Sequence, residues 1–176
     1  VEATADVTDV LCYGENTGQI ALTINNGQPP YTVTWSDGIN NTDTATALIA
    51  GTYTATVTDQ NGCSTSIQET VLQADSINLI INAIDAACSA DSTGSIDITV
   101  NGGLAPYSFL WDNNLDTLQN QINLPSNTYN VTVTDENNCT VSTSIFIDEP
   151  TPLTATPTPT EAACSGSPTG QISLDV

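Results

Sequence analysis

Five cysteines are the residues of this sequence with the clearest capacity for chemistry. Cys12, Cys88 and Cys164 recur at one constant interval, and Cys63 and Cys139 are separated by the same interval. Two consecutive segments therefore each hold one cysteine pair with an internal separation of 51 residues. We predict the disulfides Cys12–Cys63 and Cys88–Cys139, with Cys164 paired beyond residue 176. Such bridges indicate an oxidising, extracellular compartment.

Thiolate ligation of zinc or of an iron–sulfur cluster is the competing interpretation of these cysteines. Such sites use clustered cysteines, typically with short C-x-x-C spacings, and the sequence contains none. We therefore expect no metal site and no cofactor. In the chain-entropy argument a bridge that closes a loop of this size contributes roughly 4 kcal/mol, which is large for a domain of about 80 residues.

The charge balance excludes several classes of function. The 176 residues include 20 acidic side chains and no Lys, Arg or His, for a net charge of -20. Without imidazole or lysine there is no Ser-His or Cys-His pair and no Schiff base, so we expect no catalytic residues and no enzyme. A polyanion repels nucleic acid and anionic lipid, and no apolar run approaches the roughly 18 residues of a membrane span. We expect neither nucleic-acid binding nor membrane insertion.

The interval between Cys12 and Cys88 is the period of a repeat that covers the chain. Trp35 recurs as Trp111, and several short motifs recur with it: Thr17-Gly18 as Thr93-Gly94 and Thr169-Gly170, Pro30-Tyr31 as Pro106-Tyr107, and Val57-Thr58-Asp59 as Val133-Thr134-Asp135. We predict one domain at residues 1–76, a second at 77–152, and the start of a third at 153–176.

Apolar residues alternate with polar ones in each repeat, which is typical of strands with one face in a core. Tyr31, Val33 and Trp35 are one such run. About seven short strands with a Trp on the third run predict an immunoglobulin-like β-sandwich. The segment Leu48–Tyr53 is similar to the tyrosine corner of such sandwiches. The predicted fold class is all-β, with tandem sandwiches, one for each repeat, stacked into an extended rod.

The inward phase of Trp35 and Trp111 favours core packing over stacking on a sugar. Gly51 is replaced by Asn127 in the second repeat, and Gly62 is replaced by Asn138. Because Gly and Asn tolerate a positive φ best, both positions are predicted as left-handed turns. The third repeat opens with Thr156-Pro157-Thr158-Pro159, and proline cannot donate to a strand ladder, so this segment is predicted to be an edge strand.

Acidic residues also recur with the repeat, at positions where calcium binding and turn capping compete as interpretations. The recurring acids are Asp9, Asp85 and Glu161, and Asp59 with Asp135. Calcium takes six to eight oxygen ligands, and the densest local candidate, Asp112–Asp116, keeps fewer acids in its counterpart at residues 36–40. We therefore favour turn capping by Asp and Asn side chains. A glycosidase pair would need two acids across a cleft, and a repeat sandwich offers no obvious one.

Two stretches of the first repeat carry a family resemblance. Residues 27–38 (GQPPYTVTWSDG) and 50–63 (AGTYTATVTDQNGC), with Asp148-Glu149-Pro150 in the second, resemble the SprB-type repeat. The resemblance extends over nearly all of both repeats. That family occurs in very large surface proteins of Bacteroidota, including a gliding-motility adhesin exported by the type IX secretion system. In this context Asp-Ser and Asp-Thr motifs suggest O-glycosylation at Thr44, Ser76, Ser92 and Thr117.

The predicted function is therefore that of a structural repeat segment in a long secreted cell-surface filament or adhesin, serving as spacer and in adhesion. The resemblance implies an extracellular location and a role in gliding motility. Expected partners are neighbouring repeats of the same chain, with surface glycans and other filaments as further candidates. The alternative is a glycan- or protein-binding module that accompanies a secreted enzyme.

Overall fold

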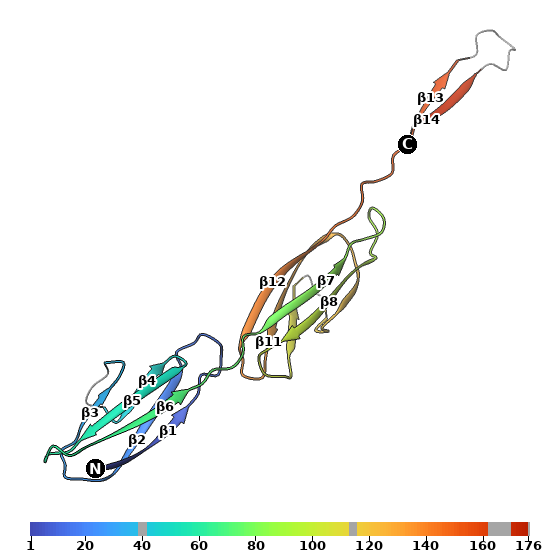
Figure 1. Ribbon diagram of the computed structural model, residues 1–176. Coiled ribbons are helices and arrows are strands. Elements are labelled where there is room, and N and C mark those ends of the chain that lie inside the picture. The colour runs from blue at the N-terminus through green and yellow to red at the C-terminus, as the bar shows by residue number, and fades with distance from the viewer. Residues whose placement is uncertain (39–41, 113–115, 162–169, 176) are drawn as a thin grey trace. The chain divides into compact units, whose positions relative to one another are not determined.

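The computed structural model describes residues 1–38, 42–112, 116–161 and 170–175, and all its regular elements are strands (Figure 1). Across these described residues no helix is long and apolar enough to cross a membrane. The chain divides into two compact units. The first comprises residues Val1–Ile80, Thr99–Leu110 and Thr132–Ser142, and the second comprises Ile81–Ile98, Trp111–Val131 and Thr143–Val176.

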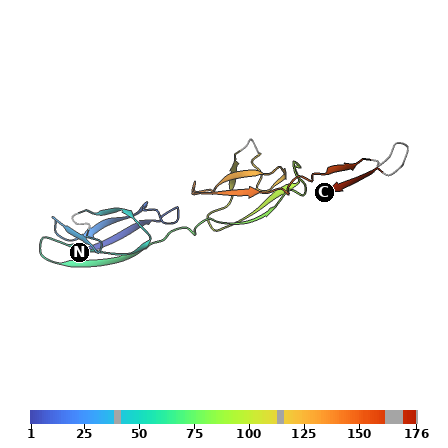
Figure 2. The ribbon, with the colours of Figure 1, turned by 90° about the horizontal axis from the view of Figure 1, so that it is seen from above.

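The first repeat contains six strands in two antiparallel sheets. They are β1 (Glu2–Thr8), β2 (Gly18–Asn26), β3 (Thr32–Trp35), β4 (Thr44–Leu48), β5 (Gly51–Thr58) and β6 (Ser64–Val71). One sheet has the order β1-β2-β4 and the other β3-β5-β6. Figures 1 and 2 show these strands running alongside one another.

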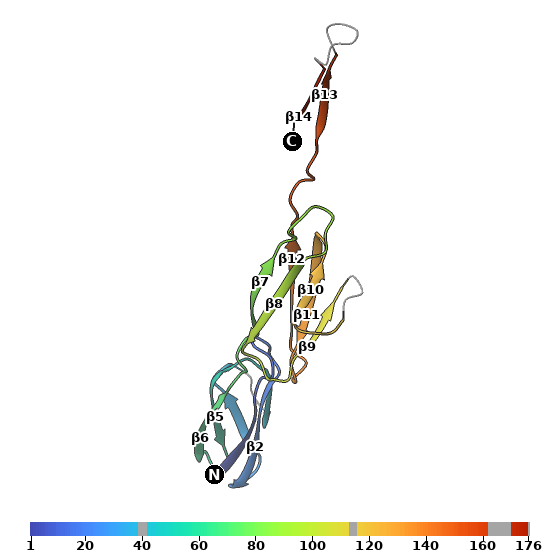
Figure 3. The same cartoon turned by 90° about the vertical axis from the view of Figure 1, so that its right-hand side faces the viewer.

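The second repeat reproduces these strands one period later, and Figure 3 labels them. They are β7 (Asn78–Ile84), β8 (Gly94–Asn101), β9 (Ser108–Trp111), β10 (Gln121–Leu124), β11 (Asn127–Thr134) and β12 (Thr140–Ile147). Their sheets have the orders β10-β8-β7 and β12-β11-β9. Two further strands, β13 (Thr156–Thr160) and β14 (Gln171–Asp175), belong to the third repeat.

Alternation of side chains along the strands builds the core, as the sequence predicts. Every second residue of β3 is buried, and so are Ala55 and Val57 in β5, of which Val57 is fully covered. The buried cluster of the first repeat draws on both sheets: Val10, Ile20, Leu22, Val33, Trp35, Ala45, Leu48, Ala55, Val57 and Val71. Many of the counterparts in the second repeat are buried too, including Ile96, Ile98, Phe109 and Trp111.

The immunoglobulin-like sandwich is confirmed by its strand order and by its corner. The first, second and fourth strands form one sheet, and the third, fifth and sixth form the other, with Trp on the third. The hydroxyl of Tyr53 donates to the carbonyl of Ile49 at 3.0 Å, and that of Tyr129 donates to Pro125 at 2.8 Å. These are tyrosine corners at the start of the fifth strand. The described residues of each repeat hold six strands, one fewer than predicted.

One of the two predicted left-handed turns is confirmed and the other is wrong. Gly62 and Asn138 have φ of 81° and 65°, as expected. Gly51 does not, because it already lies in β5 and pairs with Val71. The left-handed residue instead lies earlier, at Ala47 and its counterpart Asn123, both with φ of 58°. Each lies where the pairing of the short fourth strand shifts register.

The predicted edge strand of the third repeat is confirmed. Strand β13 contains Pro157 and Pro159, and its only neighbour in the described chain is β14. Because proline lacks an N–H, one side of this strand cannot donate to a further ladder at these positions.

The tyrosine corner yields a test of stability. Tyr129 is 2% exposed, and burial, with a smaller contribution from the Asp112 charge, raises the pKa of its hydroxyl, which therefore stays a donor. Tyr129→Phe leaves the Pro125 carbonyl without this donor and should lower the free energy of unfolding by about 1 kcal/mol. Urea titration measures the loss. Tyr13→Phe, at a side chain that is 61% exposed, is the control and should leave the midpoint unchanged.

Candidate functional site

The loop between β1 and β2 is tied to the chain that leaves β6. Asp9 accepts a hydrogen bond from the backbone N–H of Leu72 at 2.8 Å through Oδ1. The N–H of Val10, a residue that is 2% exposed, donates to the Leu72 carbonyl at 2.9 Å. The N–H of Gly14 donates to Oε1 of Gln73 at 2.9 Å. These hydrogen bonds hold the loop in place on both sides of Cys12.

The turn between β11 and β12 is organised by one buried carboxylate. Oδ1 of Asp135 accepts from the backbone N–H of Cys139 at 2.9 Å, and Oδ2 accepts from Leu104 at 3.1 Å. The N–H of Asp135 donates to the Cys139 carbonyl at 3.0 Å, and Asn138 takes the left-handed conformation that closes the turn. Asp135 is 5% exposed, so the carboxylate that holds this turn is buried beneath it.

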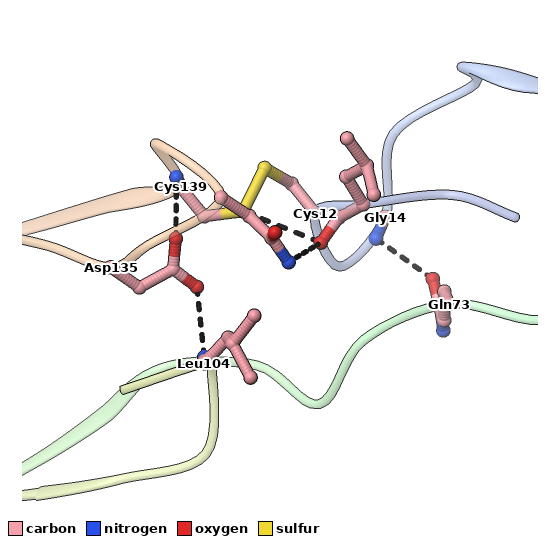
Figure 4. The surroundings of a disulfide bond; sticks show 8 residues. Cys12, Gly14, Gln73, Leu104, Asp135 and Cys139 are labelled. Atoms are coloured by element: carbon pink, nitrogen blue, oxygen red, sulfur yellow. Dashed lines mark hydrogen bonds between the residues drawn. A yellow bond between two sulfur atoms is a disulfide. The ribbon is translucent and has the colours of Figure 1, made fainter. Parts of the chain in front are cut away.

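These two segments are joined by a disulfide inside the first compact unit (Figure 4). Cys12 and Cys139 are bonded, with an S–S distance of 2.01 Å and a Cα–Cα distance of 5.5 Å. The Nδ2 of Asn137 also donates to the Leu11 carbonyl at 3.3 Å. The bridge therefore joins the first repeat to the second, across 127 residues of sequence.

The predicted bridges Cys12–Cys63 and Cys88–Cys139 are wrong. Cys63 and Cys88 are exposed free thiols. Strand β6 begins beside Cys63 and ends beside the Cys12 loop, and its eight residues span roughly 26 Å. A disulfide requires Cα atoms about 4.4 to 6.8 Å apart, so the cysteines of one repeat lie at opposite ends of the sandwich. The predicted partner of Cys164 concerns a residue outside the described part of the chain.

Sequence reasoning missed this pairing because a repeat leaves it ambiguous. A shift of one full period converts the separation of 51 residues within a repeat into the observed 127 between repeats. The available signal was positional. One cysteine precedes the second strand and the other follows the fifth, and in a sandwich of this strand order these connections lie at opposite ends.

Turn capping, the favoured interpretation of the recurring acids, is confirmed at Asp59 and Asp135. Asp9 and Asp85 instead accept from backbone N–H groups 63 residues away, after the last strand. Asp59 accepts from the N–H groups of Gln28, Asn61 and Cys63 at 3.2, 2.9 and 2.9 Å, and Asp85 accepts from Asp148 at 2.9 Å. Across the described residues no group of three or more acids or cysteines is placed to hold a metal. Residues 113–115 of the Asp112–Asp116 candidate lie outside the described residues.

Core packing of both tryptophans is confirmed. Trp35 and Trp111 are each 5% exposed, and their indole N–H groups donate to the carbonyls of Thr42 and Leu118 at 3.0 and 2.9 Å. Neither ring is available as a stacking platform for a sugar.

Of the predicted O-glycosylation residues, Ser76 lines the same pocket as Cys12 and Cys139. Ser76, Ser92 and Thr117 are exposed, whereas Thr44 in β4 is half-buried. Ser76 lies in the connection between β6 and β7, and Ser92 lies in the loop that also carries Cys88. Modification at these residues stays a prediction.

Comparison with known families identifies two segments of the chain. The family model described as the SprB repeat matches residues 4–40 and 81–116. Both segments are similar to the SprB repeat family. They lie one repeat period apart and cover the first three strands of each sandwich, except for the first residues of β1 and β7. The stretch 50–63, part of the predicted resemblance, lies outside the matched segments. The SprB family is a repeat family, and the match agrees with the internal repeat of this chain.

No curated protein matches the chain. Among solved structures, a C-terminal 282-residue fragment of intimin, in complex with the intimin-binding domain of its translocated receptor, is similar with a TM-score of 0.48 and 16% identity, over 90% of this chain and 66% of that one. Three N-terminal domains of the bacteriophage RB49 outer capsid protein Hoc give 0.44 and 20%, over 92% and 61%. The mouse nectin-like molecule 4 ectodomain gives 0.39 and 14%, over 86% and 66%. The chain thus spans less than two thirds of each.

The Asp59 turn predicts a dependence of stability on pH. Burial alone would raise the pKa of Asp59, but hydrogen bonds from the N–H groups of Gln28, Cys63 and Asn61 hold it below its ordinary value of 3.8. A lowered pKa stabilises the folded state above the ordinary value, and this contribution is lost as the pH falls through the folded pKa.

Asp59→Asn should therefore lower the urea midpoint at pH 7, and the difference from the unsubstituted protein should shrink below about pH 4. Asp97→Asn, at an exposed position in β8, is the matched control for the lost charge. An equal pH dependence in both variants would contradict the assigned role of Asp59.

Proposed function

We propose that this chain is a structural repeat segment of a long secreted filament or adhesin on a cell surface, which acts as a spacer and bears load. The observation that carries the proposal is the covalent bond between consecutive SprB repeats, Cys12–Cys139. A ligand-binding module has no need of such a bond, whereas a segment under tension gains directly from it.

The position of the bridge explains how it would strengthen a segment under tension. A pull between the chain ends reaches Cys12 after β1 and is passed to Cys139 before β12. The 127 residues of sequence separation between the two cysteines are then bypassed, including the whole connection from β6 to β7. Rupture of hydrogen bonds within that segment cannot lengthen the chain while the disulfide is intact.

The disulfide and the composition agree with an extracellular location. A disulfide persists in an oxidising compartment, and the net charge of -20 keeps a long repeat array soluble through mutual repulsion. We extend the proposal to export by the type IX system, to a role in gliding motility, and to O-glycosylation at the exposed Ser76, Ser92 and Thr117. Neighbouring repeats, surface glycans and other filaments are the proposed partners.

Surface exposure is the first test. An antibody raised against residues 1–152 should label intact cells of the source bacterium, because the proposal places the repeats outside the membrane. Labelling is measured by flow cytometry, with an antibody against a cytoplasmic protein as the control. Labelling that requires permeabilised cells would refute the proposed location.

Single-molecule pulling tests the load-bearing role. With the chain held at its two ends, reduction should add about 430 Å to the fully unfolded contour length, since 127 residues at about 3.4 Å each become extensible. Cys12→Ser should show the longer contour without reductant, and Cys63→Ser should behave as the unsubstituted chain. A contour length unaffected by reduction would show that no bridge between Cys12 and Cys139 is present to bear load.

A further inference from the structure

We propose that the two free thiols, Cys63 and Cys88, are the two halves of the same inter-repeat bridge, and that each bonds to an adjoining SprB repeat. Cys88 bonds to the fifth-strand turn of the repeat that follows, and Cys63 bonds to the first loop of a repeat that precedes. The array is then stapled at every junction. This goes beyond the spacer role, which one staple already supports.

The Cys88 loop is built as the Cys12 loop is built. Asp85 accepts from the N–H of Asp148 at 2.9 Å, as Asp9 accepts from Leu72 at 2.8 Å. The N–H of Ala86, a residue 4% exposed, donates to the Asp148 carbonyl at 2.9 Å. The N–H of Ala90 donates to Oε2 of Glu149 at 2.7 Å, where Gly14 uses Gln73. Ala90 adopts a positive φ of 60° in this hydrogen-bonded loop.

The Cys63 turn is likewise built as the Cys139 turn is built. Asp59 accepts from the N–H of Cys63 at 2.9 Å and from Gln28 at 3.2 Å, and its own N–H donates to the Cys63 carbonyl at 2.9 Å. Asp135 makes the matching bonds at 2.9, 3.1 and 3.0 Å. Gly62 supplies the positive φ that Asn138 supplies in the bonded turn.

The Cys88 loop and the Cys63 turn therefore have the same hydrogen-bonded backbone as the Cys12 loop and the Cys139 turn. The backbone that aims Cys12 and Cys139 at each other is present at Cys88 and Cys63, and both of these thiols are exposed. Neither can reach the other cysteine of its own repeat, which lies at the far end of the sandwich. The complementary half for each is a further SprB repeat.

The chemistry is thiol–disulfide exchange. Two thiols lose two protons and two electrons in forming one S–S bond, and a disulfide oxidant such as oxidised glutathione takes the electrons and leaves as two thiols. Reaction needs an accessible thiolate, which exposed positions allow.

An extended chain tests the proposal. A second copy of residues 77–152 is inserted after residue 152, so that the second repeat gains a complete successor. In the inserted copy Thr140→Ser, at an exposed position, marks peptides that contain the counterpart of Cys139. The protein is folded in a glutathione redox buffer, alkylated without reduction, and digested with pepsin, because the sequence offers trypsin no Lys or Arg. Acid also halts further exchange by protonating thiolates.

We expect two disulfides: Cys12–Cys139, and Cys88 with the marked cysteine of the inserted copy. Cys63 should be alkylated, because no repeat precedes it in this chain. With Cys88→Ser, the marked cysteine should become alkylated while Cys12–Cys139 persists, which also reports that the junction is folded.

Three outcomes would overturn the proposal. Bridges within repeats would give three disulfides and would leave Cys63 protected from alkylation. Alkylated Cys88 together with an intact Cys12–Cys139 would show that the second junction is not stapled. Loss of Cys12–Cys139 itself would remove the bond on which the inference rests. None of these outcomes bears on surface exposure, so a failure here is distinguishable from a failure of the proposed location.

Discussion

Carboxylates bonded to backbone N–H groups are the interaction on which the other features of this structure depend. The chain has no Lys, Arg or His, so its acidic side chains have no cationic side-chain partners. Asp9 and Asp85 instead bind the N–H after the last strand, and Asp59 and Asp135 bind the N–H groups of the last turn. Hydrogen bonds to an ionised acceptor are stronger than neutral ones. They fix both ends of each small sandwich.

The same carboxylates position the cysteines. Cys139 donates its own N–H to Asp135, and the Cys12 loop is held by Asp9 and Val10 against Leu72. A disulfide between flexible loops would lose more conformational entropy on forming than one between segments that are already ordered. Pre-ordered halves also explain how this chain can place a covalent bond between consecutive repeats.

A repeat array is stabilised within each repeat and across each interface between neighbours. A sandwich of this size gains only a few kcal/mol from its core, so a bridge within each repeat would be the simplest expectation. The chain instead bonds Cys12 of the first repeat to Cys139 of the second. Each repeat is stabilised by a core built on Trp35, Val57 and their counterparts, and by the tyrosine corners at Tyr53 and Tyr129.

The sequence by itself determined the repeat period, the strands and their inward faces, because alternation with period two and recurrence at a fixed interval are properties of the chain alone. It also located Trp35 and Trp111 in the core and the capping role of Asp59 and Asp135, since both follow from residue type and strand phase. The spacing of the cysteines did not determine the disulfide pairing. Every repeat offers the same two cysteines, and their separation along the chain carries no information about which ends of a sandwich they occupy. Only the tertiary structure, in which strand β6 separates Cys63 from Cys12 along its full length, decided that the bond joins one repeat to the next.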